Sequence, residues 1–129
     1  MYVDASALSA ILKNEPERHE FLRRLESADR PMTSPISAFE AALSMVPMIG
    51  SCGAATSEVH RLIVASRMAI VDVGGSSMME MALARDRYGK GSGSPAQLNL
   101  GDCVSYSLAK IHGVPLLYKG NDFAMTDLR

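Results

Sequence analysis

The chain has 129 residues, of which 47% are hydrophobic and 21% are charged, and its formal net charge is -1 at pH 7. A chain of this length buries one hydrophobic core but is too short for two, so we predict a single domain over residues 1–129. The near-neutral charge excludes a general electrostatic attraction to nucleic acid, which leaves local basic groups or bound cations to support any RNA binding.

The number of cysteines and the length of the apolar segments indicate in which cellular compartment the protein is expected. Cys52 and Cys103 are too few for a disulfide scaffold, and no secretory signal pattern precedes the first expected strand. The longest apolar tract, residues 35–55, is interrupted by Glu40 and Pro47 and falls short of a membrane span. We therefore expect a cytoplasmic protein with free thiols and no membrane association.

The first half of the chain alternates between β-prone and helical patterns. Leu8, Ile11 and Leu12 mark one helical face, and prolines stand at two expected helix starts. The predicted elements are a strand at residues 1–3, a helix at 5–14, a helix from Pro16, a strand at 31–35, a helix from Pro35 toward Met48 and a helix at 54–67.

The second half continues the alternation. Asn99 and Gly113 are suitable residues to begin and end a helix, in which Val104, Leu108 and Ile111 are expected to form the buried face. The predicted elements are a buried strand at residues 69–73, a helix to about Tyr88 with Met78, Met79 and Met81 in a core or interface, a flexible loop at 89–95, a helix at 99–113, a strand at 114–118 and a turn at 120–121.

Short strands separated by helices require crossover connections. This pattern predicts an α/β fold with three layers, in which helices cover both faces of a mostly parallel central sheet. Ligand sites in such folds collect beyond the carboxyl ends of the strands. Residues that follow the strands are therefore the first candidates for a site.

Four acidic residues occupy such positions. Asp4 follows the first strand, Glu40 lies in the helix after the second, Asp102 opens the helix before the last strand, and Asp122 comes just after that strand. Each also has a purely structural explanation, because a carboxylate can cap a helix, complete a capping box or stabilise a turn. Position alone does not separate the two interpretations.

Glu40 is the only charged residue between Pro31 and Ser57. Its apolar neighbours, among them Phe39 and Leu43, predict that it is buried on most sides. An unpaired buried carboxylate is costly or has a raised pKa, and no basic residue nearby in the sequence offers a partner.

A divalent cation would resolve this problem if Glu40 met the other three acids at the end of the sheet, because like charges at short range repel one another. An all-carboxylate site favours Mg²⁺ or Mn²⁺ over zinc, and His19, His60 and His112 show no ligand spacing. Such a site suits phosphodiester hydrolysis, since the metal lowers the pKa of a bound water and neutralises charge on the phosphate.

The segments "YVDASALSAILKNEPE", "NLGDCVSYSLAKIHGVPLLYKGNDF" and "TDL", together with Glu40, resemble the PIN-domain ribonucleases, particularly the VapC-type toxins of bacterial toxin–antitoxin pairs. The resemblance spans nearly the whole chain. It implies an α/β/α sandwich, RNA cleavage that depends on Mg²⁺ or Mn²⁺, a homodimer, and inhibition by a cognate antitoxin protein.

The resemblance also implies roles for individual residues. Asp4 and Asp102 match the metal-binding aspartates of the family, Glu40 its helix-borne acid and Asp122 its last acid. Ser6 matches a small hydroxyl residue that holds a carboxylate or water.

The match departs from the family at the last acid. Many relatives carry an acid where this chain has Asn121, so Asn121, Asp122 and Asp127 are all candidates to complete the site.

The glycine-rich stretch "YGKGSGS" does not fit a phosphate-binding loop, because Ala84 stands at the first glycine position and Gly91 at the hydroxyl position. We expect a mobile loop there, with Lys90 and Arg87 as candidate contacts to RNA phosphates.

Two other functions compete with a nuclease. A phosphatase of the haloacid dehalogenase type also places an aspartate after the first strand, but it needs a second acid where this chain has Ser6. A catalytically weak PIN-fold binding module that acts through a protein partner would use the same apolar helices. A receiver-like signalling domain fits less well, because Lys119 is present but the acidic pair after the first strand is absent.

Overall fold

The computed structural model describes residues 1–128, and its elements follow the predicted order. They are β1 (Tyr2–Val3), α1 (Ala5–Leu12), α2 (Arg18–Ser27), β2 (Met32–Thr33), α3 (Pro35–Ile49), α4 (Cys52–Ala65), β3 (Ala69–Ile70), α5 (Ser77–Tyr88), α6 (Leu100–His112), β4 (Leu116–Leu117) and the short 3-10 helix η1 (Phe123–Met125). No helix within residues 1–128 is both long and apolar enough to cross a membrane.

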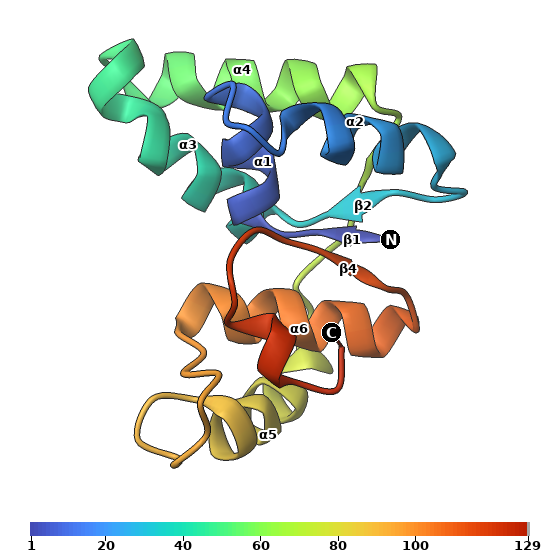
Figure 1. Cartoon of the computed structure of the whole chain (residues 1–129), viewed down its shortest axis with the longest axis vertical. Helices are drawn as coiled ribbons and strands as arrows, with labels where there is room; N and C mark the ends of the chain where they lie inside the picture. The colour runs from blue at the N-terminus through green and yellow to red at the C-terminus, as the bar shows by residue number, and fades with distance from the viewer. Residues whose placement is uncertain (129) are drawn as a thin grey trace.

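The four strands form one parallel sheet in the order β3-β2-β1-β4. Tyr2 lies opposite both Met32 and Leu116, which fixes the register at the centre of the sheet. Helices α1 to α4 lie on one side of the sheet, and α5, α6 and η1 lie on the other (Figure 1). The predicted three-layer α/β fold is confirmed.

The two residues of β1 face opposite cores, because side chains alternate across a strand. Val3 packs into a cluster with residues of α1, α3 and α4, including Leu8 and Met45. Tyr2 packs into a second cluster with residues of α6 and β4, including Leu108. The central strand β1 is thus buried on both faces, as strands of parallel sheets usually are.

Capping residues set the start and end of α3, the helix that contains Glu40. The Ser34 hydroxyl accepts a hydrogen bond from the Ser37 amide at 3.2 Å, and Pro35 occupies the first helical turn. Gly50 ends the helix with a φ of 98°, a conformation that glycine adopts without steric cost.

Two burial predictions outside the candidate site were wrong. The strand predicted as buried at 69–73 is only Ala69–Ile70 and is exposed, because β3 lies at the edge of the sheet and pairs only with β2. Ile111 is 43% exposed, because burial along α6 ends at Ala109 and its last turn projects beyond the core. Met78 and Met79 are exposed on the first turn of α5, so of the two predicted settings for them, a core or an interface, the core is excluded.

Candidate active site

Asp4 occupies the place where the strand order reverses. The chain runs from β1 outward through β2 to β3, and returns to the other side of β1 as β4. Asp4 follows β1 directly, is 3% exposed, and its amide donates to the Leu117 carbonyl at 2.9 Å. In open α/β sheets this reversal point is the usual ligand crevice.

Both oxygens of the Asp4 carboxylate accept hydrogen bonds. Oδ2 accepts from the Ser6 amide at 2.9 Å and the Ser6 hydroxyl at 2.6 Å, which makes Asp4 the N-cap of α1 as well. Oδ1 accepts from the Ser105 hydroxyl at 2.5 Å. The Lys119 amide donates to the Ser6 hydroxyl at 3.0 Å, so the chain leaving β4 also orients this carboxylate.

A buried chain of hydroxyl groups continues behind Asp4. Ser105 Oγ lies 3.2 Å from Ser37 Oγ, which lies 2.8 Å from the Tyr2 hydroxyl, and the Tyr2 hydroxyl donates to Ser34 Oγ at 2.8 Å. Burial raises the pKa of Tyr2, so the hydroxyl keeps its proton. The sequence analysis did not predict this row of hydrogen-bonded hydroxyl groups. The only signal for it in the sequence was serine at helical positions where the pattern called for apolar residues.

Asp102 has the structural role that a capping box predicts. Its amide donates to Asn99 Oδ1 at 2.9 Å, and its Oδ2 accepts from the Asn99 amide at 3.0 Å. Its pKa is nevertheless raised to about 6, because burial and the charges of Asp4 and Asp122 outweigh the Asn99 hydrogen bond and the charge of Lys90. Asp102 therefore caps α6 and also lies close to the other acidic residues.

Glu40 is not buried on most sides, which corrects the prediction. The residue is exposed on α3, and its neighbours Phe39 and Leu43 are 52% and 48% exposed. Only its carboxylate tip is enclosed: a Cβ built on Gly101 would lie 2.6 Å from Glu40 Oε2 and 2.8 Å from Cδ. Burial of this tip, followed by the charges of Asp4 and Asp102, raises the pKa of Glu40.

The three candidates for the last acid lie in different surroundings. The charge of Asp122 acts on Asp102, whereas Asn121 is exposed and its backbone carbonyl accepts from Ala124. Asp127 accepts from the Tyr106 hydroxyl at 2.6 Å and from Lys110 at 2.8 Å, and these partners lower its pKa. Asp127 is thus held by structural contacts to the middle and last turns of α6, whereas Asp102 lies in its first turn.

The two basic residues predicted to contact RNA phosphates, Lys90 and Arg87, lie in different surroundings. The charge of Lys90 acts on Asp102, so Lys90 lies on the side of the acidic residues. The charge of Arg87 acts on Tyr106 instead. Lys90 is therefore the better placed of the two for a phosphate near the acids.

The side chains of residues 1–128 include no group of three or more acids, histidines or cysteines already arranged to hold a metal ion. The donor set still suits a hard divalent ion, because it consists of carboxylate oxygens. Two of these carboxyl groups have pKa values raised partly by neighbouring acids, a repulsion that a cation would relieve. The joint metal site of the four acids stays a prediction.

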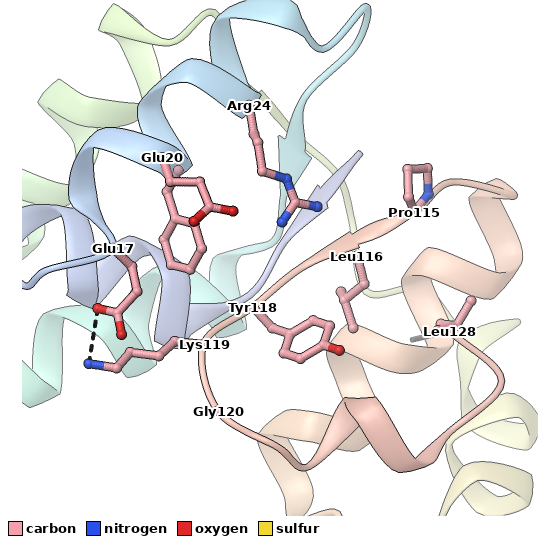
Figure 2. A pocket seen from close by; sticks show the side chains of 10 residues that line it. Glu17, Glu20, Arg24, Pro115, Leu116, Tyr118, Lys119, Gly120 and Leu128 are labelled. Atoms are coloured by element: carbon pink, nitrogen blue, oxygen red, sulfur yellow. Dashed lines mark ion pairs between the residues drawn. The ribbon is translucent and has the colours of Figure 1, made fainter.

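The hollow in Figure 2 is a different place, and none of the four acids lines it. Lys119 points from the end of β4 toward the start of α2, where it pairs with Glu17 at 3.3 Å and also with Glu15 (Figure 2). Lys119 therefore ties β4 to the α1–α2 connection, and it does not serve the role that a receiver-like domain gives its lysine.

Comparisons with known proteins agree with this geometry. A family model described as the PIN domain matches residues 1–128. A VapC ribonuclease of Rhizobium meliloti is 40% identical, with 98% of each chain covered. Ribonuclease VapC30 of Mycobacterium tuberculosis is 38% identical, with 99% of this chain and 95% of the relative covered. The crystal structure of M. tuberculosis VapC20, described as a Sarcin-Ricin loop cleaving toxin, has a TM-score of 0.77 at 14% identity and covers 99% of this chain and 95% of its own, a likeness of fold.

Proposed function

Because the chain belongs to the PIN domain family, we propose that it is a metal-dependent endoribonuclease, the toxin of a VapC-type toxin–antitoxin pair. The observation that carries the proposal is that α6 brings three acids together beyond the carboxyl end of β1: the Glu40 carboxylate lies against Gly101, next to Asp102, and Ser105 bonds to Asp4. Relatives of nearly the same length are named ribonucleases, which supports the same activity here.

We assign the metal to Asp4, Glu40, Asp102 and Asp122, with Mg²⁺ or Mn²⁺ as the ion. A bound ion would lower the pKa of a water molecule and neutralise charge on the scissile phosphate. The chain's own contribution is orientation: Ser6 and Ser105 hold Asp4, and the Asn99 amide holds Asp102.

The direct test is incubation of the purified protein with mixed RNA and Mg²⁺ or Mn²⁺, with and without a chelator, followed by mapping of the cut ends. We expect internal cuts that the chelator prevents. Cleavage that is equal with and without the chelator would contradict metal dependence, and no cleavage of any RNA would contradict the nuclease itself.

We further propose that the protein acts in the cytoplasm as a single domain that forms a homodimer and is inhibited by a cognate antitoxin. The family membership supports this set of partners. A small neighbouring reading frame whose product binds this chain and blocks RNA cleavage would identify the antitoxin, and light scattering of the purified chain would give its oligomeric state.

Replacing Ser105 with alanine is expected to weaken Mn²⁺ binding about tenfold, because residues that orient a metal ligand contribute roughly 10–100-fold to affinity. The change removes the donor to Asp4 Oδ1 and leaves the Ser6 bonds in place. Isothermal titration with Mn²⁺ measures the effect. Ser107→Ala is the matched control, because this buried serine of the same helix donates only to the Cys103 carbonyl. Equal affinities for the two variants would mean that Ser105 has no positioning role.

The raised pKa of Asp102 predicts a pH dependence of stability. Without metal, the folded chain keeps a proton on Asp102 up to about pH 6, whereas the unfolded chain releases it near 3.8. The protonated Asp102 therefore costs the folded state nothing below about pH 4. As the pH rises from 4 through 6 the folded chain must either keep this proton or bury a charge, so the free energy of unfolding falls over this range. We expect the metal-free Asp102→Asn variant to gain in Tm relative to the unchanged protein between pH 4 and 7.

Adding Mg²⁺ at pH 7 should reverse this order, since an ion that binds only the folded state stabilises it by mass action. The unchanged protein should gain in Tm with the metal, and Asp102→Asn should gain little. Equal gains would show that Asp102 is not a ligand.

A further inference from the structure

A cavity of about 450 Å³ lies between α5 and the start of α6. Its volume is within the range of roughly 300–1,000 Å³ that is typical of small-molecule sites. The lining combines apolar residues with basic ones: Met81, Ala82, Leu98 and Leu100 line it together with Arg85 and Lys90. Leu100 is 81% exposed, an unusual position for a leucine in the first turn of a helix.

The cavity adjoins the acidic residues. Asn99, Leu100 and Cys103 line it, and all three belong to the same helical turn as Asp102. Lys90 also lines it, so this lysine shares the cavity with the first turn of α6. A ligand in the cavity would therefore lie beside the proposed metal site.

The arginine of the cavity lies against the glycine loop. A Cβ on Gly89 would overlap the side chain of Arg85, and a Cβ on Gly91 would lie at ordinary contact distance, 4.0 Å, from Arg85 Nη2. Glycine at position 89 thus leaves room for the arginine side chain. The loop is closed at its base by the Gly89–Leu98 bridge, where the Leu98 amide donates to the Tyr88 carbonyl at 2.8 Å.

The basic side is available to an anion. Within residues 1–128, neither Arg85 nor Lys90 forms an ion pair, although three other basic residues of this part of the chain do. Two free cations beside an apolar wall match the chemistry of a nucleotide, which joins a flat apolar base to a phosphate. Proteins commonly bind single-stranded RNA by stacking its bases on aromatic side chains or on arginine guanidinium planes, and in this cavity Arg85 supplies such a plane.

We propose that this cavity binds one nucleobase of single-stranded RNA, next to the phosphate at the acidic site, with Arg85 and Lys90 on the adjoining phosphate. This inference rests on the proposed ribonuclease function and locates a binding subsite within it. The base lies against Leu98, Leu100 and Met81.

The test compares binding of two fluorescein-labelled strands of equal length, a single-stranded RNA and the same ribose-phosphate backbone without bases. Fluorescence anisotropy is measured with Ca²⁺ in place of Mg²⁺, and gel analysis verifies that the RNA stays intact. The unchanged protein should bind the RNA about tenfold more tightly than the abasic strand, as expected for one bound base. Equal affinity for both strands would overturn the proposal.

Two variants locate the effect. Ala82→Phe fills the cavity from an exposed helical position and should remove the preference for bases, whereas Ala54→Phe on the exposed start of α4 should keep it. Arg85→Glu should weaken binding of both strands, and Arg23→Glu on α2 should not.

The outcomes separate this inference from the function itself. A protein that cuts RNA but whose Ala82→Phe variant still prefers base-bearing RNA contradicts only the base site. If Ala82→Phe instead loses binding to the antitoxin and keeps RNA binding, the cavity receives a protein side chain and the proposal is wrong. A protein that neither binds nor cuts RNA contradicts the proposed function.

Discussion

Replacing Asp102 with asparagine is expected to lower RNA cleavage about 100-fold or more while the protein stays folded. The asparagine oxygen can still accept the Asn99 amide hydrogen bond, so the capping role survives. What is lost is the negative charge that the proposed metal requires. Cleavage of a labelled RNA at saturating Mg²⁺ measures activity, and circular dichroism verifies the fold.

Asp127→Asn is the matched control for this experiment. Asp127 was a candidate for the last acid, but its carboxylate bonds to Tyr106 and Lys110. The exposed pair with Lys110 is worth at most about 1 kcal/mol, so the variant should fold and cleave normally. An inactive Asp127→Asn beside an active Asp102→Asn would move the reaction centre toward the C-terminal end of α6.

The sequence predicted the acids better than their surroundings. The positions of Asp4 and Asp102 on their elements were predicted correctly, because Asp4 directly follows a strand and Asp102 stands three residues after a helix cap, and such positions depend on local pattern. The burial of Glu40 was inferred from an uncharged stretch around it. That inference failed because Phe39 and Leu43 are themselves half exposed, so an apolar neighbourhood in the sequence was not a buried one.

The hydroxyl chain behind Asp4 depends on contacts that no local pattern contains. Tyr2, Ser37 and Ser105 come from β1, α3 and α6, and they meet only because both helices pack near the carboxyl end of β1. The exposure of β3 likewise depends on the order of the strands, because that order places β3 at the edge of the sheet. Element type is a local property of the chain, whereas these features follow from its tertiary arrangement.

Replacing Gly101 with alanine is expected to lower RNA cleavage about 100-fold and to leave folding intact or improved. The added Cβ would overlap the Glu40 carboxylate, and Glu40 must move because it is the flexible partner. Displacing a reacting group by about 1 Å can cost about 100-fold in rate. Alanine also favours a helix by up to about 1 kcal/mol over glycine. Cleavage assays and urea unfolding measure the two effects.

Gly53→Ala provides the matched control, because this glycine is also in the first turn of a helix and a Cβ there would meet nothing within 4 Å. It should gain stability without losing activity. If Gly101→Ala acts by displacing Glu40, combining it with Glu40→Gln should cost no more activity than Glu40→Gln alone, because both changes remove the same group. Additive losses in the double variant would show that Gly101 affects the reaction through another contact, and full activity in Gly101→Ala would remove Glu40 from the site.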